Sequence, residues 1–268
     1  MNDTFGFIGT GNMGSALATA AVKGMEAKGV YLANRTWEKA EALAAQLSCQ
    51  VASIERIAET CNFIFLGVKP QQMGALLSDL APTLAKRRDD FVLVTMAAGL
   101  TMERIRTMAG GQYPVIRIMP NTPVAVGAGM ILYTATENVS EPALKQFLDN
   151  MRFSGVLDPV PENLIDVGSA VAGCGPAFAA MFLEALADGG VACGLSRQKA
   201  LLYASQMLLG TAKLALENGK HPSRLKDEVC SPGGSTIAGV KALEDGAFRA
   251  AVMNAVAKAF ERNLELGK

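Results

Sequence analysis

The chain has 268 residues, of which 50% are hydrophobic and 19% are charged, so it is long enough and apolar enough to bury a core. Its 25 Lys and Arg residues balance its 25 Asp and Glu residues, which argues against a partner that is nucleic acid or an anionic membrane surface. The five cysteines form no C-x-x-C spacing, which argues against a zinc site and favours a reducing compartment. We therefore expect a cytoplasmic protein with no resident metal, no signal peptide and no membrane span.

The first half of the chain alternates between predicted strands and predicted helices. Short apolar runs bounded by polar residues, glycine or proline are typical of parallel strands that are covered on both faces. Such runs lie at residues 4–8, 30–33, 63–68, 91–96 and 115–119, and helical patterns lie at 12–28 and 37–47. The alternation predicts right-handed crossovers and an α/β fold with a Rossmann-type, doubly wound sheet.

After about Pro161 the strand signals stop and the pattern becomes helical. Ala, Leu, Met and Gly recur at helical spacing over residues 177–195, 199–219 and 248–266. We expect two domains, with a dinucleotide-binding domain at residues 1–160 and an all-helical substrate and dimerisation domain at residues 161–268. The apolar faces are wide for a helical region of this size, so we expect a homodimer or a ring of dimers.

A glycine motif, FGFIGTGNMG, follows the first predicted strand and begins the first predicted helix. Gly9 permits the tight turn, Gly11 lets the backbone approach a pyrophosphate, and Gly14 lets the helix pack closely on the strand. Asn12 and Met13 complete the turn, where backbone N–H groups and the helix dipole attract phosphate. The motif in this context predicts a dinucleotide site.

The end of the second predicted strand indicates which dinucleotide binds. NAD-binding proteins place an Asp or Glu there to hold the ribose 2′-hydroxyl, whereas this chain has Asn34, Arg35 and Thr36. Arg35 can pair with a 2′-phosphate, while Asn34 and Thr36 can donate hydrogen bonds to it. We predict NADP(H) as the cofactor and leave NAD(H) open as a second one.

Further short segments are spread in order across nearly the whole chain. They are FIGTGNMG, GVKP, TMAAG, MPNTP, AGCGPAF, ADGGV and LKDEVCSPGGST. Together they resemble pyrroline-5-carboxylate reductase, and MPNTP and SPGGST are not general features of Rossmann proteins. The resemblance implies the reduction of a five-membered cyclic imine, 1-pyrroline-5-carboxylate, to L-proline by NAD(P)H, the last step of proline biosynthesis. It also implies a helical domain that interlocks with a partner subunit.

The resemblance implies roles for particular residues as well. The substrate contacts that it implies fall on Glu162, Ser235 and Thr236, and the residues themselves add Gly233 and Gly234. The two glycines leave backbone N–H groups exposed at the beginning of a helix, which suits the substrate carboxylate. The implied contacts with the nicotinamide half of the cofactor fall on Val68, Lys69, Pro70, Ala97 and Ala98. For Asn121 in MPNTP we predict a structural role, in which its side chain fixes the loop through bonds to the backbone.

The source of the proton in this reaction is a separate question. The one histidine, His221, precedes a proline in a polar connector, so we predict a surface or capping role for it. A threonine hydroxyl is too weak an acid to give up its proton, although it can form a hydrogen bond to the ring nitrogen. A cyclic imine that arrives protonated already accepts hydride well. We therefore expect Thr236 and Ser235 to act by positioning the ring, with no dedicated general acid.

Two departures from the family pattern keep other functions open. Cys174 stands where the family has serine, and Glu228 stands where asparagine or a small residue is usual; a carboxylate near cofactor phosphates is unfavourable unless it turns away. The chain could reduce another cyclic imine, or it could be a non-catalytic paralogue that binds NADP(H). A related group of hydroxy-acid dehydrogenases uses a lysine on the first interdomain helix, and the segment GCGPAFAAMFLE contains none.

Overall fold

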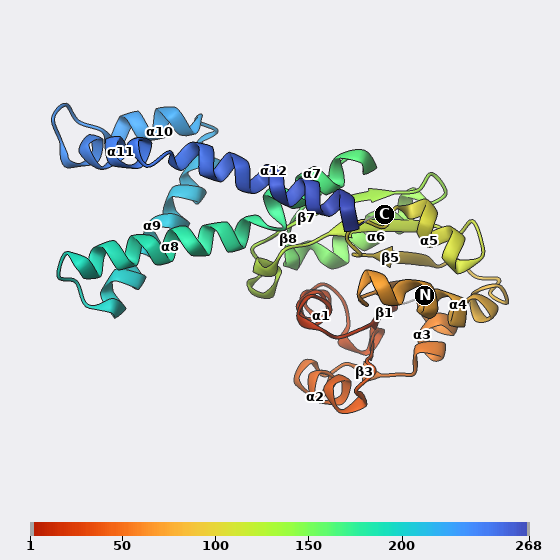
Figure 1. Cartoon of the computed structure of the whole chain (residues 1–268). Coiled ribbons are helices and arrows are strands. Elements are labelled where there is room, and N and C mark those ends of the chain that lie inside the picture. Colours follow the sequence, from red (N-terminus) through yellow and green to blue (C-terminus); the bar gives the residue numbers. More distant parts are fainter. Residues whose placement is uncertain (1–2, 267–268) are drawn as a thin grey trace. The chain divides into compact units, whose positions relative to one another are not determined.

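The computed structural model describes residues 3–266, which form two compact units (Figure 1). The first unit contains residues 3–174 together with residues 259–266, and the second contains residues 175–258. The sequence places the domain boundary at residues 160 and 161. The compact units instead change at residues 174 and 175, because Ile165 of the following helix packs with Met119 and Leu132 of the sheet.

The first unit is built on an eight-stranded sheet with the order β3-β2-β1-β4-β5-β6-β7-β8. The strands are β1 (Phe5–Ile8), β2 (Val30–Ala33), β3 (Gln50–Val51), β4 (Phe63–Leu66), β5 (Val92–Thr95), β6 (Val115–Met119), β7 (Gly129–Ala135) and β8 (Gly155–Pro159). All neighbours pair in parallel except β6 and β7, which are antiparallel. The order reverses between β1 and β4, and this switch point is where open sheets of this kind bind ligands. The predicted Rossmann-type sheet is confirmed.

Helices and short 3₁₀ turns connect the strands of this unit. The helices are α1 (Asn12–Gly24), α2 (Trp37–Leu47), α3 (Ile54–Thr60), α4 (Pro70–Leu84), α5 (Met102–Ala109), α6 (Glu141–Met151) and α7 (Glu162–Ala172), and the turns are η1 (Ala27–Gly29), η2 (Thr122–Val126) and η3 (Arg152–Ser154). Helix α1 ends four residues before its predicted end at Lys28. A Cβ atom at Gly24 would lie 2.0 Å from the carbonyl oxygen of Asn150, so α1 and α6 approach closely at this glycine.

An apolar core lies on each face of the sheet. On one face the rings of Phe7 and Phe65 stack at 4.2 Å, and Phe147 of α6 packs against Phe65. On the other face Ile64 and Leu66 belong to a core that α3 and α4 cover. Because successive side chains of a strand point to opposite faces, the run FIFL of β4 contributes to both cores.

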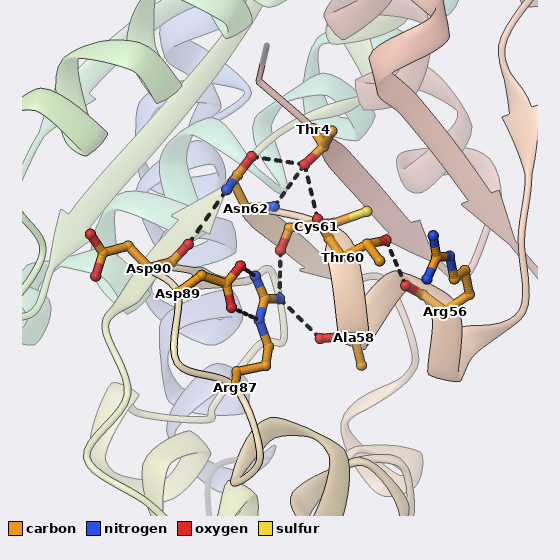
Figure 2. Close-up of polar contacts among 9 residues, drawn as sticks. All are labelled: Thr4, Arg56, Ala58, Thr60, Cys61, Asn62, Arg87, Asp89 and Asp90. Carbon is orange, nitrogen blue, oxygen red and sulfur yellow. Dashed lines mark hydrogen bonds and ion pairs between the residues drawn. The ribbon is translucent and has the colours of Figure 1, made fainter. Parts of the chain in front are cut away.

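Arg87 ties the carboxyl end of α3 to the segment that leads into β5 (Figure 2). Its guanidinium donates to the carbonyl oxygens of Ala58 and Cys61 at 2.9 and 2.7 Å, and to the two carboxylate oxygens of Asp89 at 2.9 and 2.6 Å. The side chain is only 4% exposed. It therefore satisfies carbonyl groups that the end of α3 leaves without a partner inside the helix.

The second unit is helical, as predicted. It contains α8 (Gly175–Ala192), α9 (Arg197–Asn218), α10 (Pro222–Val229), α11 (Ser235–Asp245) and the first part of α12 (Phe248–Leu266). Helices α8 and α9 pack through Ala187, Ala200 and Ala204. Many larger apolar side chains of this unit are exposed, among them Met181 at 69% and Met253 at 72%. Such a concentration of exposed apolar groups marks an interaction surface.

Candidate active site

The glycine loop between β1 and α1 lies at the switch point of the sheet. Gly9 has φ +99°, and a Cβ atom there would lie 2.6 Å from the carbonyl oxygen of Gly67 after β4. A Cβ atom at Gly14 would lie 2.1 Å from the carbonyl oxygen of Gly9, so α1 can begin directly against the loop only with glycine here. A Cβ atom at Gly11 would meet nothing within 4 Å among residues 3–266. Gly11 thus borders open space that a phosphate can enter.

The buried hydroxyl of Thr10 supports the same assignment. Thr10 is 8% exposed, and its Oγ1 has no hydrogen-bond partner in the described part of the chain. The N-cap of α1 is Gly11, which has no side chain to accept from the first N–H groups of the helix, and Asn12 and Met13 form the first turn. Unpaired donors and an orphaned hydroxyl fit a bound pyrophosphate. Sequence reasoning missed Thr10, because the motif is defined by its glycines.

The residues predicted to contact the 2′-phosphate form the turn between β2 and α2. Asn34 Nδ2 donates to the carbonyl oxygen of Thr36 at 3.1 Å, which closes the turn, and Arg35 is exposed. The N–H of Gly9 donates to the carbonyl oxygen of Ala33 at 2.8 Å. This bond places the turn directly beside the glycine loop, where an adenosine ribose would follow a pyrophosphate.

The residues predicted to contact the nicotinamide half follow β4 and β5. They are Val68, Lys69 and Pro70 after β4, and Ala97 and Ala98 after β5. Lys69 is the exposed N-cap residue of α4, and the N–H of Ala97 lies 3.4 Å from Thr95 Oγ1. Since β4 lies between β1 and β5 in a parallel sheet, the structure gathers the predicted cofactor residues at one edge of the sheet.

Glu162, for which the resemblance implies a substrate contact, is bound by residues of its own unit. Its Oε1 accepts from the backbone N–H of Met102 at 2.7 Å and lies 3.5 Å from Nη1 of Arg117 in β6. Arg117 Nη2 lies 2.8 Å from Asp166 Oδ1. No observation tests the substrate contact, which stays a prediction. Sequence reasoning missed Arg117 and Asp166, although an arginine within the apolar run VIRIM needs carboxylate partners, and ENLID offers two on one helix face.

Asn121 joins the MPNTP segment to two neighbouring elements. Its Nδ2 donates to the carbonyl oxygen of Ala172 at the end of α7 at 3.0 Å, and its Oδ1 accepts from the N–H of Met130 in β7 at 2.9 Å. The residue is 8% exposed. The predicted structural role of Asn121 is confirmed.

In the second unit the SPGG segment forms a tight turn before α11. The N–H of Gly234 donates to the carbonyl oxygen of Ser231 at 3.0 Å, and Gly233 has φ +66°. Proline followed by a residue of positive φ matches a type II β-turn, and glycine meets that requirement. Helix α11 begins at Ser235 with Gly234 as its N-cap, without a side-chain cap bond among the described residues. Ser235 and Thr236 are exposed in this first turn, and its N–H groups, which no side chain caps, are open to an anion.

Glu228 is held by cations of its own unit. Both of its carboxylate oxygens lie 2.9 Å from Lys220 Nζ, and Oε1 lies 3.3 Å from Arg224 Nε. The hydrogen bond from Lys220, helped by the charges of both cations, holds the pKa of Glu228 below its ordinary value. The carboxylate of Glu228 is therefore directed to Lys220 and Arg224.

His221 and the cysteines are the remaining residues that could act as an acid or as metal ligands. His221 is the N-cap of α10, where its Nδ1 accepts from the N–H of Ser223 at 3.3 Å, so the predicted capping role is confirmed. All five cysteines are free. Among the described residues, no group of three His, Cys, Asp or Glu side chains is arranged to hold a metal ion.

Comparisons with known proteins identify the family. Residues 162–266 match the family model described as pyrroline-5-carboxylate reductase dimerisation, and residues 4–99 match that described as NADP oxidoreductase coenzyme F420-dependent. The pyrroline-5-carboxylate reductase of Escherichia coli is 38% identical over 100% of both chains. The chain belongs to the pyrroline-5-carboxylate reductase family.

Solved structures of this family agree with that assignment. The pyrroline carboxylate reductase of Plasmodium falciparum, solved with NADP bound, is 30% identical with a TM-score of 0.87, and the match covers 100% of this chain and 99% of that one. The pyrroline-5-carboxylate reductase of Coxiella burnetii is 29% identical with a TM-score of 0.89, and the match covers 100% of both chains. The match over residues 4–99 spans β1 to β5 and contains the predicted cofactor residues, while the match over residues 162–266 begins with α7.

Proposed function

We propose that this protein reduces 1-pyrroline-5-carboxylate to L-proline with NADPH in the last step of proline biosynthesis. The observation that carries the proposal is the SPGGST segment, whose type II turn opens onto an uncapped helix with two exposed hydroxyls. An uncapped helix start binds a carboxylate well, and a hydroxyl in its first turn can reach a ring nitrogen next to that carboxylate. Relatives at 37–38% identity over almost the entire chain carry the name of this reductase.

The cofactor in this proposal is NADP(H). Gly9, Gly11 and Gly14 shape the phosphate-binding loop. The buried Thr10 hydroxyl, which has no partner among the described residues, can bond to the pyrophosphate, and Arg35 supplies a cation after β2. The absence of a carboxylate among residues 34–36 removes the repulsion that a 2′-phosphate would otherwise meet.

The chain's own residues contribute binding and orientation in the proposed mechanism. When bound, NADPH supplies the hydride that reduces the imine carbon. The N–H groups at the start of α11, together with the backbone of Gly233 and Gly234, hold the substrate carboxylate. The Thr236 hydroxyl and its neighbour Ser235 orient the ring nitrogen, which already carries the proton that remains on the product amine. The protein needs no residue that transfers a proton, because positioning and electrostatics suffice for an iminium.

The decisive experiment follows NADPH absorbance after 1-pyrroline-5-carboxylate is added to purified protein. Rapid loss of absorbance with stoichiometric formation of proline supports the proposal. Turnover of a six-membered cyclic imine alone would indicate a different imine reductase. Tight NADPH binding without turnover of either imine would indicate a non-catalytic paralogue.

For the assembly we propose a homodimer or a ring of dimers that uses the apolar face of the second unit. Helices α8, α11 and α12 form a groove lined by Phe178, Met181, Phe182, Leu243, Phe248 and Val252. Within it the rings of Phe182 and Phe248 lie 5.9 Å apart. A groove this apolar is unfavourable in water and favours burial by a second copy.

The assembly is tested by light scattering on the intact protein and on Met181→Lys. We expect the wild type to be dimeric or larger at micromolar concentration and Met181→Lys to dissociate. Val126, 78% exposed in the first unit, offers the matched control Val126→Lys, which should keep the wild-type mass. A wild-type protein that is an active monomer would contradict this assembly.

We place the protein in the cytoplasm, because its cysteines are all free, as in a reducing compartment. The stretch Glu162–Ala192 is long and apolar enough to span a membrane by length and composition alone. It consists of two helices, α7 and α8, and acidic side chains of the first bind Arg117. We therefore assign its apolar side chains to helix packing and to the subunit interface.

A further inference from the structure

Helix α7 is bonded to the start of α5 and shares an apolar cluster with the loop between β5 and α5. Glu162 Oε1 accepts from the N–H of Met102, the first residue of α5, at 2.7 Å. Farther along α7, Ile165 is fully buried in a cluster against which Ala98 packs. The loop that carries the predicted nicotinamide contacts Ala97 and Ala98 thus packs on the cluster to which Ile165 of α7 belongs and is tied to α7 at its far end.

The loop between β5 and α5 also contains two local hydrogen bonds, one at each end. Thr101, the N-cap of α5, accepts from the N–H of Arg104 at 3.3 Å, and Thr95 Oγ1 lies 3.4 Å from the N–H of Ala97. The carboxylate of Glu162 adds a second acceptor at the start of α5 from outside the helix. A negative charge at this position is favoured by the helix dipole.

Arg117 determines where Glu162 can lie. Its side chain is 1% exposed in the middle of β6, and Glu162 and Asp166 lie 3.5 and 2.8 Å from its guanidinium nitrogens. A buried guanidinium is strongly destabilising without carboxylate partners, so α7 is held with these two acids facing β6. The bond from Asn121 to the carbonyl of Ala172 holds the other end of α7.

We propose that Glu162, oriented by Arg117, is a positioning residue that keeps the Ala97–Ala98 loop in the shape that binds the nicotinamide half of the cofactor. Glu162 Oε1, the oxygen that lies 3.5 Å from Arg117, accepts from the backbone N–H of Met102. Glu162 therefore affects the reaction through the cofactor loop. The proposal rests on the proposed function only in assigning this loop to the nicotinamide.

The test measures the Kd of NADPH by cofactor fluorescence, with no imine present, on Glu162→Ala and Glu162→Gln. Loss of a charge-assisted hydrogen bond to the loop should weaken binding about tenfold in Glu162→Ala. Glu162→Gln keeps an acceptor oxygen for Met102 and should stay within about threefold of the wild type. With NADPH saturating, the KM of the imine should change by less than about twofold in both variants.

A matched control comes from the opposite end of α5. Glu137 lies 3.2 Å from Arg106 of α5, whose side chain is also buried, so it too is a carboxylate paired with a buried arginine. It does not touch the Ala97–Ala98 loop in any contact of the described chain. Glu137→Ala should therefore leave the Kd of NADPH within about twofold of the wild type.

The competing role of Glu162 as a substrate contact gives the opposite pattern. An unchanged Kd of NADPH in Glu162→Ala, or a raised imine KM with normal NADPH binding, would overturn the positioning role. Should Glu162→Ala fail to fold, Glu162→Asp decides the matter: it keeps the charge but is too short to reach Met102, so it should weaken NADPH binding more than Glu162→Gln. The reverse order would reject the proposal. The binding assay contains no imine, so its result can be interpreted even if the protein does not reduce 1-pyrroline-5-carboxylate.

Discussion

Arg117 Nη2 lies 2.8 Å from Asp166 Oδ1, and this ion pair joins the middle of β6 to α7. The arginine side chain is 1% exposed and the aspartate side chain 19%. The carbonyl oxygen of Asp166 also accepts from Asn263 Nδ2 at 3.0 Å, near the end of α12. Asp166 of α7 therefore has two contacts within the first unit. Its carboxylate binds Arg117 of the sheet, and its carbonyl oxygen binds Asn263 of α12.

Removal of the Asp166 carboxylate should destabilise the protein strongly. In Asp166→Ala the buried guanidinium keeps, among the residues that the structure describes, only Glu162, at 3.5 Å, as a carboxylate partner. We expect the free energy of unfolding to fall by about 3 kcal/mol, measured by urea denaturation at one protein concentration. The exposed pair of Lys145 and Asp149 provides the control, since Asp149→Ala should cost less than about 1 kcal/mol. Equal losses in the two variants would show that burial of Arg117 is not the cause.

Arg35 should discriminate between the two nicotinamide cofactors. Arg35→Ala removes the cation after β2, and the KM of NADPH should rise about tenfold while the KM of NADH changes less. Steady-state kinetics with each cofactor measure both effects. Lys39, exposed on α2, is the control, and Lys39→Ala should leave both KM values near those of the wild type. Equal losses with NADPH and NADH for Arg35→Ala would reject the 2′-phosphate assignment.

Thr236 should contribute through one positioning hydrogen bond. Thr236→Ala should lower kcat/KM for the imine by about 10- to 100-fold, and Thr236→Ser, which keeps the hydroxyl, should lose much less. The NADPH Kd, measured without imine, should not change in either variant. A serine variant as poor as the alanine variant would mean that the methyl group, and not the hydroxyl, matters.

The pH profile tests where the proton comes from. Activity should fall as the pH rises through the pKa of the substrate iminium, because the neutral imine accepts hydride poorly. This falling limb of the pH profile should persist in Thr236→Ala and in His221→Ala. His221→Ala should also retain nearly full activity. Loss of the limb, or of activity, in His221→Ala would show that a protein acid supplies the proton.

Cys61 should contribute to the loss of stability at alkaline pH. Burial raises the pKa of its thiol from the ordinary 9.0 to about 12, so the native state holds the proton where the unfolded chain releases it. Its contribution is fully present below about pH 9 and is lost as the pH rises towards about 12. Cys61→Ala should therefore show a shallower fall in unfolding free energy between about pH 8 and 10.5 than the wild type, by up to about 2 kcal/mol.

Urea denaturation of both proteins across this pH range provides the comparison. All other ionisable groups are present in both proteins, so the difference between the two curves isolates Cys61. Parallel curves would contradict the raised pKa. Exposed Cys193 serves as a control, because Cys193→Ala should follow the wild-type slope.

Local patterns were sufficient for much of the fold and for the family. The run FIFL, the spacing of Gly9, Gly11 and Gly14, and the SPGGST segment are each a few residues long, and each has one favourable local conformation. The predicted strands and the glycine loop are accordingly found in the structure. Strands β3, β7 and β8 were missed. Strand β3 has two residues and the side chains of edge strand β8 are partly or fully exposed, so neither forms an apolar run, whereas β7 contains the apolar run MILY, which could have been found.

Tertiary structure alone decided what surrounds Glu162. Its partners Met102 and Arg117 lie 60 and 45 positions away, and no local pattern links them. The sequence contained the fact that an arginine stands within an apolar strand, which requires a carboxylate, but not which carboxylate. Which carboxylate it is depends on how α7 packs on the sheet. Ile165 of α7 is buried against Met119 and Leu132, and this burial turns the face of α7 with Glu162 and Asp166 towards Arg117.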